Sequence, residues 1–285
     1  MNMDLLKETK ELCSLYHIKP SPTKGQNFLL SSLVYDKIVE AARIKKTDIV
    51  MEVGPGLGFL TMALADQAKQ VIAVELDDKL VEILPDRFRS FEYNNITIVH
   101  DNVLNWTRLR GLPEFGEFKI VANLPYNISS IFLRKFLTSE HKPTTMTLML
   151  QDEVARRIAA KSGDMSLLAL SVQYYANVEY LFKVMARDFY PAPKVNSAVV
   201  QIVLKSAKDL PLNEAQEKLF FRLAKIGFSS RRKILKSNLL NVIKIKPELM
   251  AELMTKNNIS LMARAQDLSV ADWLGLLGSL GEYMV

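Results

Sequence analysis

The chain has 285 residues, 49% hydrophobic and 24% charged, with a formal net charge of +6, a composition typical of one large domain or a large and a small one. Its one cysteine, Cys13, excludes a disulfide framework and a cysteine-based zinc site and is typical of a reducing compartment. No apolar secretory signal opens the chain and no run of about 18 apolar residues occurs, so we expect a soluble, cytoplasmic protein outside the membrane.

Short apolar runs alternate with amphipathic stretches from residue 47 to about 205. We expect buried strands over 48–54, 70–76, 96–101, 118–124 and 144–150. We expect helices over 58–68, 78–90 and 129–138. This alternation predicts an α/β fold with a doubly wound, mostly parallel sheet.

Two later runs, 180–185 and 197–205, also predict strands. The proline-containing link between them is too short for a crossover helix, so we expect an antiparallel pair at one sheet edge. After "KDLPL" (208–212) the pattern is helical, and we expect a domain boundary near 206–212. The sequence thus predicts a catalytic domain over 1–207 and a small all-helical domain over 208–285.

Positive charge is concentrated in residues 205–246, which hold 11 Lys or Arg against 3 acidic residues. This stretch supplies more than the whole net charge of the chain. A local basic excess indicates binding to phosphates, although a solvated helical face would show the same composition.

A glycine loop, "MEVGPGLGFLT" (51–61), follows the first expected strand. Gly54, Gly56 and Gly58 permit a sharp turn and close approach of a ligand, but Phe59 breaks the dinucleotide pattern GxGxxG. Glu75 ends the next strand about 20 residues later, where a carboxylate can bind ribose hydroxyls.

Asp101 and Asn102 end the third strand, at the same sheet edge. Asp101 can accept from the exocyclic amine of adenine, and the Asn102 backbone can read a ring nitrogen. Each acidic residue alone is more often a helix cap or a solvated loop residue. Together with the glycine loop they predict a nucleoside cofactor, for which S-adenosylmethionine fits better than NAD.

The fourth strand ends in "NLPY" (123–126). An aromatic amine is a poor nucleophile, and a site that accepts both its hydrogens favours the pyramidal geometry that frees the lone pair. Asn123 Oδ1 and the Leu124 carbonyl can be those acceptors, while Pro125 stiffens the turn and Tyr126 can stack on the base. The alternative is an ordinary turn closed by a surface tyrosine. The chain's three histidines fit no triad or metal spacing, so we expect no metal.

A proline-stiffened segment, "DFYPAPKVNSAVV" (188–200), joins the two edge strands. A base removed from its stack is held between aromatic faces, and Phe189 opposite Tyr126 would form such a clamp. The alternative is that Phe189 fills the core beneath a loop.

From about residue 20 to its end, the chain resembles the ribosomal RNA adenine N6,N6-dimethyltransferases, most closely the small-subunit (KsgA-type) branch. Six motifs in order carry the resemblance: "KGQNFL" (24–29), "EVGPGLGFLT" (52–61), "NLPY", "FYPAPKVNSAVV" (189–200), "FSSRRKILKSNL" (228–239) and "RAQDLS" (264–269). The resemblance implies a class I methyltransferase (Rossmann-like) fold. It also implies dimethylation at N6 of two adjacent adenosines in a hairpin loop near the 3′ end of small-subunit ribosomal RNA.

Roles for individual residues follow from the same resemblance. Cofactor contacts are expected at Gln26, Asn27, Leu29, Gly54, Gly56, Glu75, Asp101, Asn102 and Asn123, and catalytic roles at Asn123, Leu124, Tyr126 and Phe189. Phosphate contacts are expected at Arg231, Arg232, Lys233 and Lys236. We expect a monomer whose substrate is the RNA within a partly assembled small subunit.

Three alternatives remain open from the sequence. The large-subunit methyltransferases that confer macrolide resistance share the first four motifs, but the C-terminal motifs favour the small-subunit branch. DNA and protein-glutamine methyltransferases use similar Asn-Pro-Pro-Tyr sites, but the basic helical tail and the "GQNFL" opening of this chain count against them. A non-catalytic assembly factor of the same fold is opposed by the intact glycine loop, Asn123 and Tyr126.

Overall fold

The computed structural model describes residues 5–20, 25–105 and 116–284. It divides into two compact units, one of residues 1–155 with 178–204 and the other of residues 156–177 with 205–285. The chain passes from the first unit to the second at residues 204–205, beside the boundary that the sequence predicts near 206–212. The sequence did not indicate that residues 156–177 join the helical unit, and the functional division at 207–208 stays a prediction.

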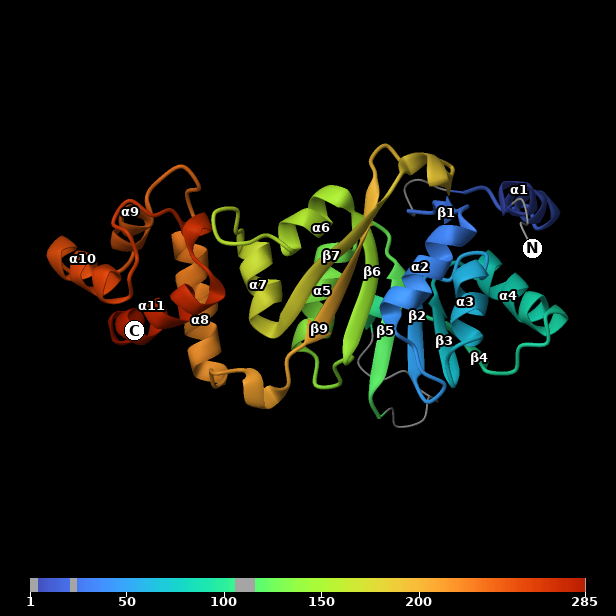
Figure 1. Cartoon of the computed structure of the whole chain (residues 1–285), viewed down its shortest axis with the longest axis horizontal. Coiled ribbons are helices and arrows are strands. Elements are labelled where there is room, and N and C mark those ends of the chain that lie inside the picture. The colour runs from blue at the N-terminus through green and yellow to red at the C-terminus, as the bar shows by residue number, and fades with distance from the viewer. Residues whose placement is uncertain (1–4, 21–24, 106–115, 285) are drawn as a thin grey trace. The chain divides into compact units, whose positions relative to one another are not determined.

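Seven strands form one sheet within the described residues, in the order β4-β3-β2-β5-β6-β9-β7 (Figure 1). Their bounds are β2 Ile49–Val53, β3 Gln70–Glu75, β4 Ile96–His100, β5 Phe118–Asn123, β6 Thr145–Gln151, β7 Ala176–Val184 and β9 Ser197–Leu204. The five neighbouring strands β4, β3, β2, β5 and β6 are parallel, and β9 runs antiparallel to β6. The expected doubly wound sheet with an antiparallel edge is therefore confirmed. Strand order reverses between β2 and β5, where such sheets bind ligands beyond the carboxyl ends of the strands.

Helices cover both faces of this sheet. The sheet unit contains α1 Leu5–Leu15, α2 Ser32–Ala42, α3 Phe59–Ala65, α4 Asp78–Ser90 and α5 Ser129–Thr138. Because crossovers between parallel strands are right-handed, α3 and α4 lie on one face and α5 on the other (Figure 1). The last three helices match the sequence-based expectations closely, whereas α1 and α2 were not predicted.

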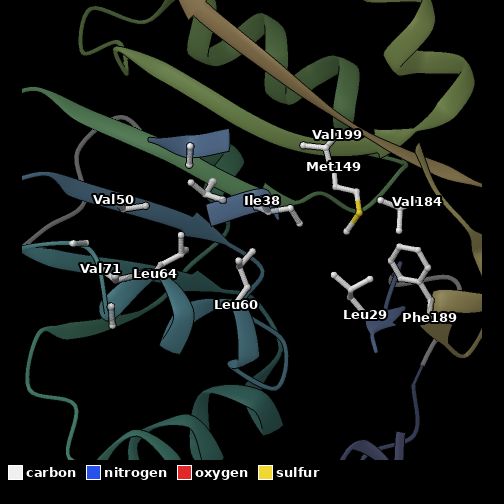
Figure 2. Close-up of a cluster of buried hydrophobic side chains, with 14 residues drawn as sticks. Leu29, Ile38, Val50, Leu60, Leu64, Val71, Met149, Val184, Phe189 and Val199 are labelled. Atoms are coloured by element: carbon white, nitrogen blue, oxygen red, sulfur yellow. The ribbon is translucent and has the colours of Figure 1, made fainter. Parts of the chain in front are cut away.

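A two-stranded antiparallel sheet joins two segments that are far apart in the sequence. Strand β1 (Phe28–Leu29) pairs with β8 (Phe189–Tyr190), with Leu29 opposite Phe189. The Leu30 N–H extends the pairing by donating to the Asp188 carbonyl at 2.8 Å. Figure 2 shows the Phe189 ring near Leu29, Val184 and Met149, in a cluster of buried hydrophobic side chains. The N-terminal segment, which carries the expected cofactor contacts Gln26, Asn27 and Leu29, is thus hydrogen-bonded to the segment that carries Phe189.

The second unit is helical. It contains α7 Leu167–Tyr175, α8 Glu214–Gly227, α9 Leu235–Leu240, α10 Pro247–Lys256 and α11 Val270–Leu280, and α6 (Asp152–Ile158) begins in the first unit and ends here. Trp273 is buried and stacks on Phe228 with ring centroids 5.5 Å apart. The buried Asn238 amide donates to the Gly227 and Ser230 carbonyls at 2.7 and 3.0 Å. These bonds fix the turn that carries the basic residues after α8. None of the described helices is both long and apolar enough to span a bilayer.

Candidate active site

A cavity of about 410 Å³ lies where the carboxyl ends of β2, β3 and β5 meet the segment around β1. All nine residues expected to contact a cofactor line it: Gln26, Asn27, Leu29, Gly54, Gly56, Glu75, Asp101, Asn102 and Asn123. Three of the four expected catalytic residues do not line it: Leu124, Tyr126 and Phe189. The cavity therefore lies at the strand-order reversal, where such sheets bind ligands, and the fold brings together there residues about a hundred positions apart in the sequence.

The glycine loop leaves room for a ligand at Gly54. Its backbone has φ +68, and its N–H donates to the Val74 carbonyl at 2.9 Å, which fixes the turn. A Cβ built at Gly54 would meet nothing within 4 Å, so this side of the residue faces open space in the cavity. The loop therefore fits a bulky ligand that approaches the backbone closely.

Another glycine brings the N-terminal motif against the "NLPY" turn. Gly25 has φ +70, and a Cβ on it would lie 2.8 Å from the Pro125 Cβ. The residue at position 25 therefore has to lack a side chain if the two segments are to touch.

Glu75 is fixed by three backbone donors. Its Oε2 accepts from the Gly56 N–H at 3.2 Å, and its Oε1 accepts from the N–H groups of Leu76 and Asp77 at 2.8 and 2.9 Å. Burial nevertheless raises the pKa of this carboxyl above its ordinary value. A carboxylate has about four lone-pair positions, so Glu75 keeps capacity for a hydroxyl donor from a ligand.

Asp101 and Asn102 interact with each other at the end of β4. The Asn102 N–H donates to Asp101 Oδ1 at 2.6 Å, and the Asp101 N–H donates to the Glu75 carbonyl at 3.0 Å. The expected reading of a ring nitrogen by the Asn102 N–H therefore requires the Asp101 carboxylate to turn away first. That role stays a prediction.

The orientation of the Asn123 amide follows from its neighbour. Asn123 Nδ2 donates to the Asn27 carbonyl at 3.4 Å. A carbonyl can only accept, so this contact turns Nδ2 toward Asn27 and leaves Oδ1 as the acceptor for another group. Next along the chain, Leu124 is buried and its N–H donates to the Met149 carbonyl at 3.2 Å. The strand end is thus held from both sides.

The two aromatic residues expected to clamp a base lie in different surroundings. Tyr126 is partly buried, its hydroxyl lies 2.8 Å from Ser197 Oγ, and burial raises the pKa of its phenol. Phe189 is only 3% exposed and packs in the core (Figure 2). Phe189 therefore lies where the alternative interpretation put it, in the core beneath a loop. A clamp against Tyr126 would require the Phe189 ring to leave this packing.

Glu52 is a site residue that the sequence analysis missed. It lies in β2, is 1% exposed and lines the cavity, and its Oε2 has no hydrogen-bond partner within the described part of the chain. Burial raises its pKa to about 8. A charged residue inside the apolar run "DIVMEVG" was the available signal, because a buried carboxyl oxygen without a hydrogen bond is costly and marks a candidate functional site.

Glu52→Gln is expected to alter how stability depends on pH in the ligand-free protein. Burial on folding raises the pKa of Glu52 from its ordinary value of 4.5 to about 8, so the unfolded state binds fewer protons between these pH values. The free energy of unfolding therefore falls as pH rises through this window. We expect the variant to exceed wild type by about 1–3 kcal/mol at pH 7.5 and by much less at pH 5. Thermal unfolding at both pH values checks this, and a pH-independent difference would contradict it.

The expected phosphate contacts lie in the helical unit. Arg231, Arg232 and Lys233 are exposed on the turn between α8 and α9, whereas Lys236 is partly buried in α9. Arg231 also lines a second cavity of about 410 Å³ together with Arg156 and Arg157. The sequence analysis missed this arginine pair, for which the doubled "RR" at the end of an amphipathic stretch was the available signal.

No group of three or more His, Cys, Asp or Glu side chains in the described ranges could hold a metal ion.

Comparison with known proteins bears on the whole chain. A family model described as ribosomal RNA adenine dimethylase matches residues 19–281. A ribosomal RNA small subunit methyltransferase A from Dehalococcoides mccartyi is 42% identical over 269 residues, which are 94% of this chain and 91% of the relative. The protein of the same description from Alkaliphilus oremlandii is 35% identical over 283 residues, 97% of each chain.

Two solved structures share the fold. A dimethyladenosine transferase from Plasmodium falciparum has a TM-score of 0.76 and 26% identity over 90% of this chain and 98% of that one. The 23S rRNA methyltransferase ErmE has a TM-score of 0.73 and 26% identity over 90% of this chain and all of that one. The match to residues 19–281, with relatives more than a third identical along nearly the whole chain, shows that this protein belongs to the ribosomal RNA adenine dimethylase family.

Proposed function

We propose that the protein transfers methyl groups from S-adenosylmethionine to N6 of two adjacent adenosines in a hairpin loop near the 3′ end of small-subunit ribosomal RNA. The product is N6,N6-dimethyladenosine, formed in the cytoplasm as the small subunit is assembled. The observation that carries the proposal is the gathering of the glycine loop, Glu75, Asp101 and Asn123 around one cavity. The relatives named as small subunit methyltransferases support the choice of RNA.

The cavity suits this cofactor. The open side of Gly54 would admit it, Glu75 would accept from ribose hydroxyls, and Asp101 would accept from the adenine amine. When bound, S-adenosylmethionine supplies an electrophilic methyl group on a sulfonium centre. Calorimetric titration tests this step: one equivalent should bind, and NAD should not.

Asn123 and the Leu124 carbonyl would activate the target amine. Asn123 Oδ1 and this carbonyl would accept its two N–H hydrogens, which favours a pyramidal nitrogen with its lone pair free. At each transfer the nitrogen would gain one methyl and release one proton to water, and at the second transfer only one N–H would remain for these acceptors to bind. Because the leaving group departs neutral, alignment rather than a strong base supplies much of the rate. In agreement with this account, no histidine is found among the described residues that line the cavity.

The basic turn would bind backbone phosphates. Changing Arg231, Arg232 and Lys233 together to Ala is expected to weaken binding to small-subunit RNA about 10- to 100-fold near 0.1 M salt. The slope of log affinity against log salt concentration should become shallower by about 2. The variant neutralises fewer phosphates, so fewer counterions are released when it binds RNA.

A matched control removes the same charge elsewhere. Lys45, Lys46 and Lys69 are exposed and precede β2 and β3, at the strand ends opposite to the cavity. Filter binding of labelled RNA across salt concentrations should find the triple Ala variant of these lysines close to wild type. Equal losses for both triple variants would mean that net charge alone, and not this turn, binds the RNA.

A further inference from the structure

We infer that Ser197 is a positioning residue for methyl transfer, which holds the Tyr126 ring in place through a hydroxyl–hydroxyl hydrogen bond. The inference rests on the proposed function and on the expectation from the sequence that Tyr126 stacks on the target base. Ser197 itself touches neither base nor cofactor in this account, and it acts only through Tyr126.

Ser197 is a rigid anchor. It is the first residue of β9, is 0% exposed and pairs with Gln151 of β6. Its Oγ lies 2.8 Å from the Tyr126 hydroxyl, a normal distance for such a bond. A buried strand residue in the sheet therefore meets the far end of a side chain from the "NLPY" turn.

The neighbouring residue fixes the segment that carries Phe189. The Asn196 carbonyl accepts from the Asp152 N–H at 3.0 Å, and Asn196 Oδ1 accepts from the Ala186 N–H at 3.0 Å. Residues 186 and 196 thus close the segment at its base, directly beside Ser197. The Tyr126–Ser197 bond consequently links the turn that presents the amine acceptors to the base of the segment that bears the second aromatic residue.

This bond restricts where the Tyr126 ring can lie. A tyrosine held only at its Cα can exchange χ1 rotamers, and each exchange moves the ring to a different place. A hydrogen bond at the para position leaves one rotamer favoured, so the ring face is ready before a base arrives. A phenylalanine would offer the same face without this constraint, which accounts for a tyrosine at this partly buried position.

A double-mutant cycle tests the inference on unmethylated small ribosomal subunits with labelled S-adenosylmethionine. Ser197→Ala and Tyr126→Phe each remove one partner of the bond, and each is expected to lower the single-turnover rate about 5- to 10-fold. The double variant should be no slower than the slower single variant, because the second change removes nothing that remains. Ser197→Cys keeps a weak donor, so its single-turnover rate should lie between those of wild type and Ser197→Ala. In the Tyr126→Phe background, the same change should leave the rate as it is in Tyr126→Phe alone.

Thr147→Val is the matched control. It removes a buried hydroxyl from β6, the strand next to β9, and that hydroxyl has no partner among the described residues. Its rate should equal that of wild type. Losses that multiply in the double Ser197 and Tyr126 variant, or a wild-type rate for Ser197→Ala, would overturn the inference.

A second readout does not depend on catalysis. With ring-labelled tyrosine, Ser197→Ala should shift and broaden the NMR signal of Tyr126, assigned through Tyr126→Phe, and leave the other tyrosine signals in place. An unchanged Tyr126 signal would overturn the inference even if no acceptor were methylated. Failure of the proposed function would instead appear as an inactive wild type.

Discussion

Replacing Asn123 by Ala is expected to lower the rate of methyl transfer about 100- to 1000-fold, the loss found when one preorganised hydrogen-bonding group is removed from an active site. The Asn27 carbonyl turns Nδ2 toward itself and leaves Oδ1 for the amine, so the variant loses an acceptor that is already oriented. Single-turnover kinetics at saturating S-adenosylmethionine measure the effect. RNA binding should stay within about threefold of wild type, because the proposed phosphate contacts belong to the helical unit and not to this strand end.

Asn123→Asp separates the acceptor from the rest of the side chain. It keeps an oxygen that can accept from the amine but loses the N–H that donates to Asn27, so its rate should lie between those of wild type and Asn123→Ala. Full methylation by Asn123→Ala would show that the acceptor has been assigned to the wrong residue. Loss of RNA binding by that variant would show that the residue acts in binding instead.

Gly54→Ala should weaken binding of S-adenosylmethionine about 10- to 100-fold. The new methyl group would occupy the open side of the glycine loop, and a φ of +68 is unfavourable for alanine. Calorimetry of the purified protein gives the dissociation constant directly. RNA binding should not change, since Gly54 belongs to the loop and not to the basic turn.

Gly163→Ala controls for backbone strain. Gly163 also has a positive φ, of +105, and open space where a Cβ would be, but it does not line the cavity. It should lower the melting temperature as Gly54→Ala does while leaving the cofactor affinity at the wild-type value. If both variants bound the cofactor equally well, the cavity beside Gly54 would not be the binding site.

The longer strands and their helices could be predicted from the sequence, because the strands form apolar runs and the helices show an amphipathic period. Ranges such as 78–90 and 129–138 agree with α4 and α5 to the residue. Strand β1 has two residues and carries no period, so its pairing with β8 had to come from the structure. The helix over 167–175 was missed because the apolar side chains around it face other helices far along the chain, a tertiary effect that local pattern does not contain.

The same contrast holds for the candidate site. Glu75, Asp101 and Asn123 could be found because each ends a parallel strand, and such ends meet at one edge. The consequences of burial could not be found in this way. Phe189 was expected beside Tyr126 but lies in the core, and Glu52 was read as part of a strand although it lines the cavity. Ser197 lies within the motif 189–200, but the sequence assigns it no role, because its contact with Tyr126 spans 71 positions.

The most direct test of the account is transfer of labelled methyl from S-adenosylmethionine to four acceptors: unmethylated small subunits, naked small-subunit RNA, large-subunit RNA and duplex DNA. The labelled nucleoside is identified by mass spectrometry. We expect N6,N6-dimethyladenosine at two adjacent positions in small-subunit RNA, with the assembled subunit as the better acceptor, and none in the other two. Label in large-subunit RNA alone, or cofactor binding without label in any acceptor, would contradict the account.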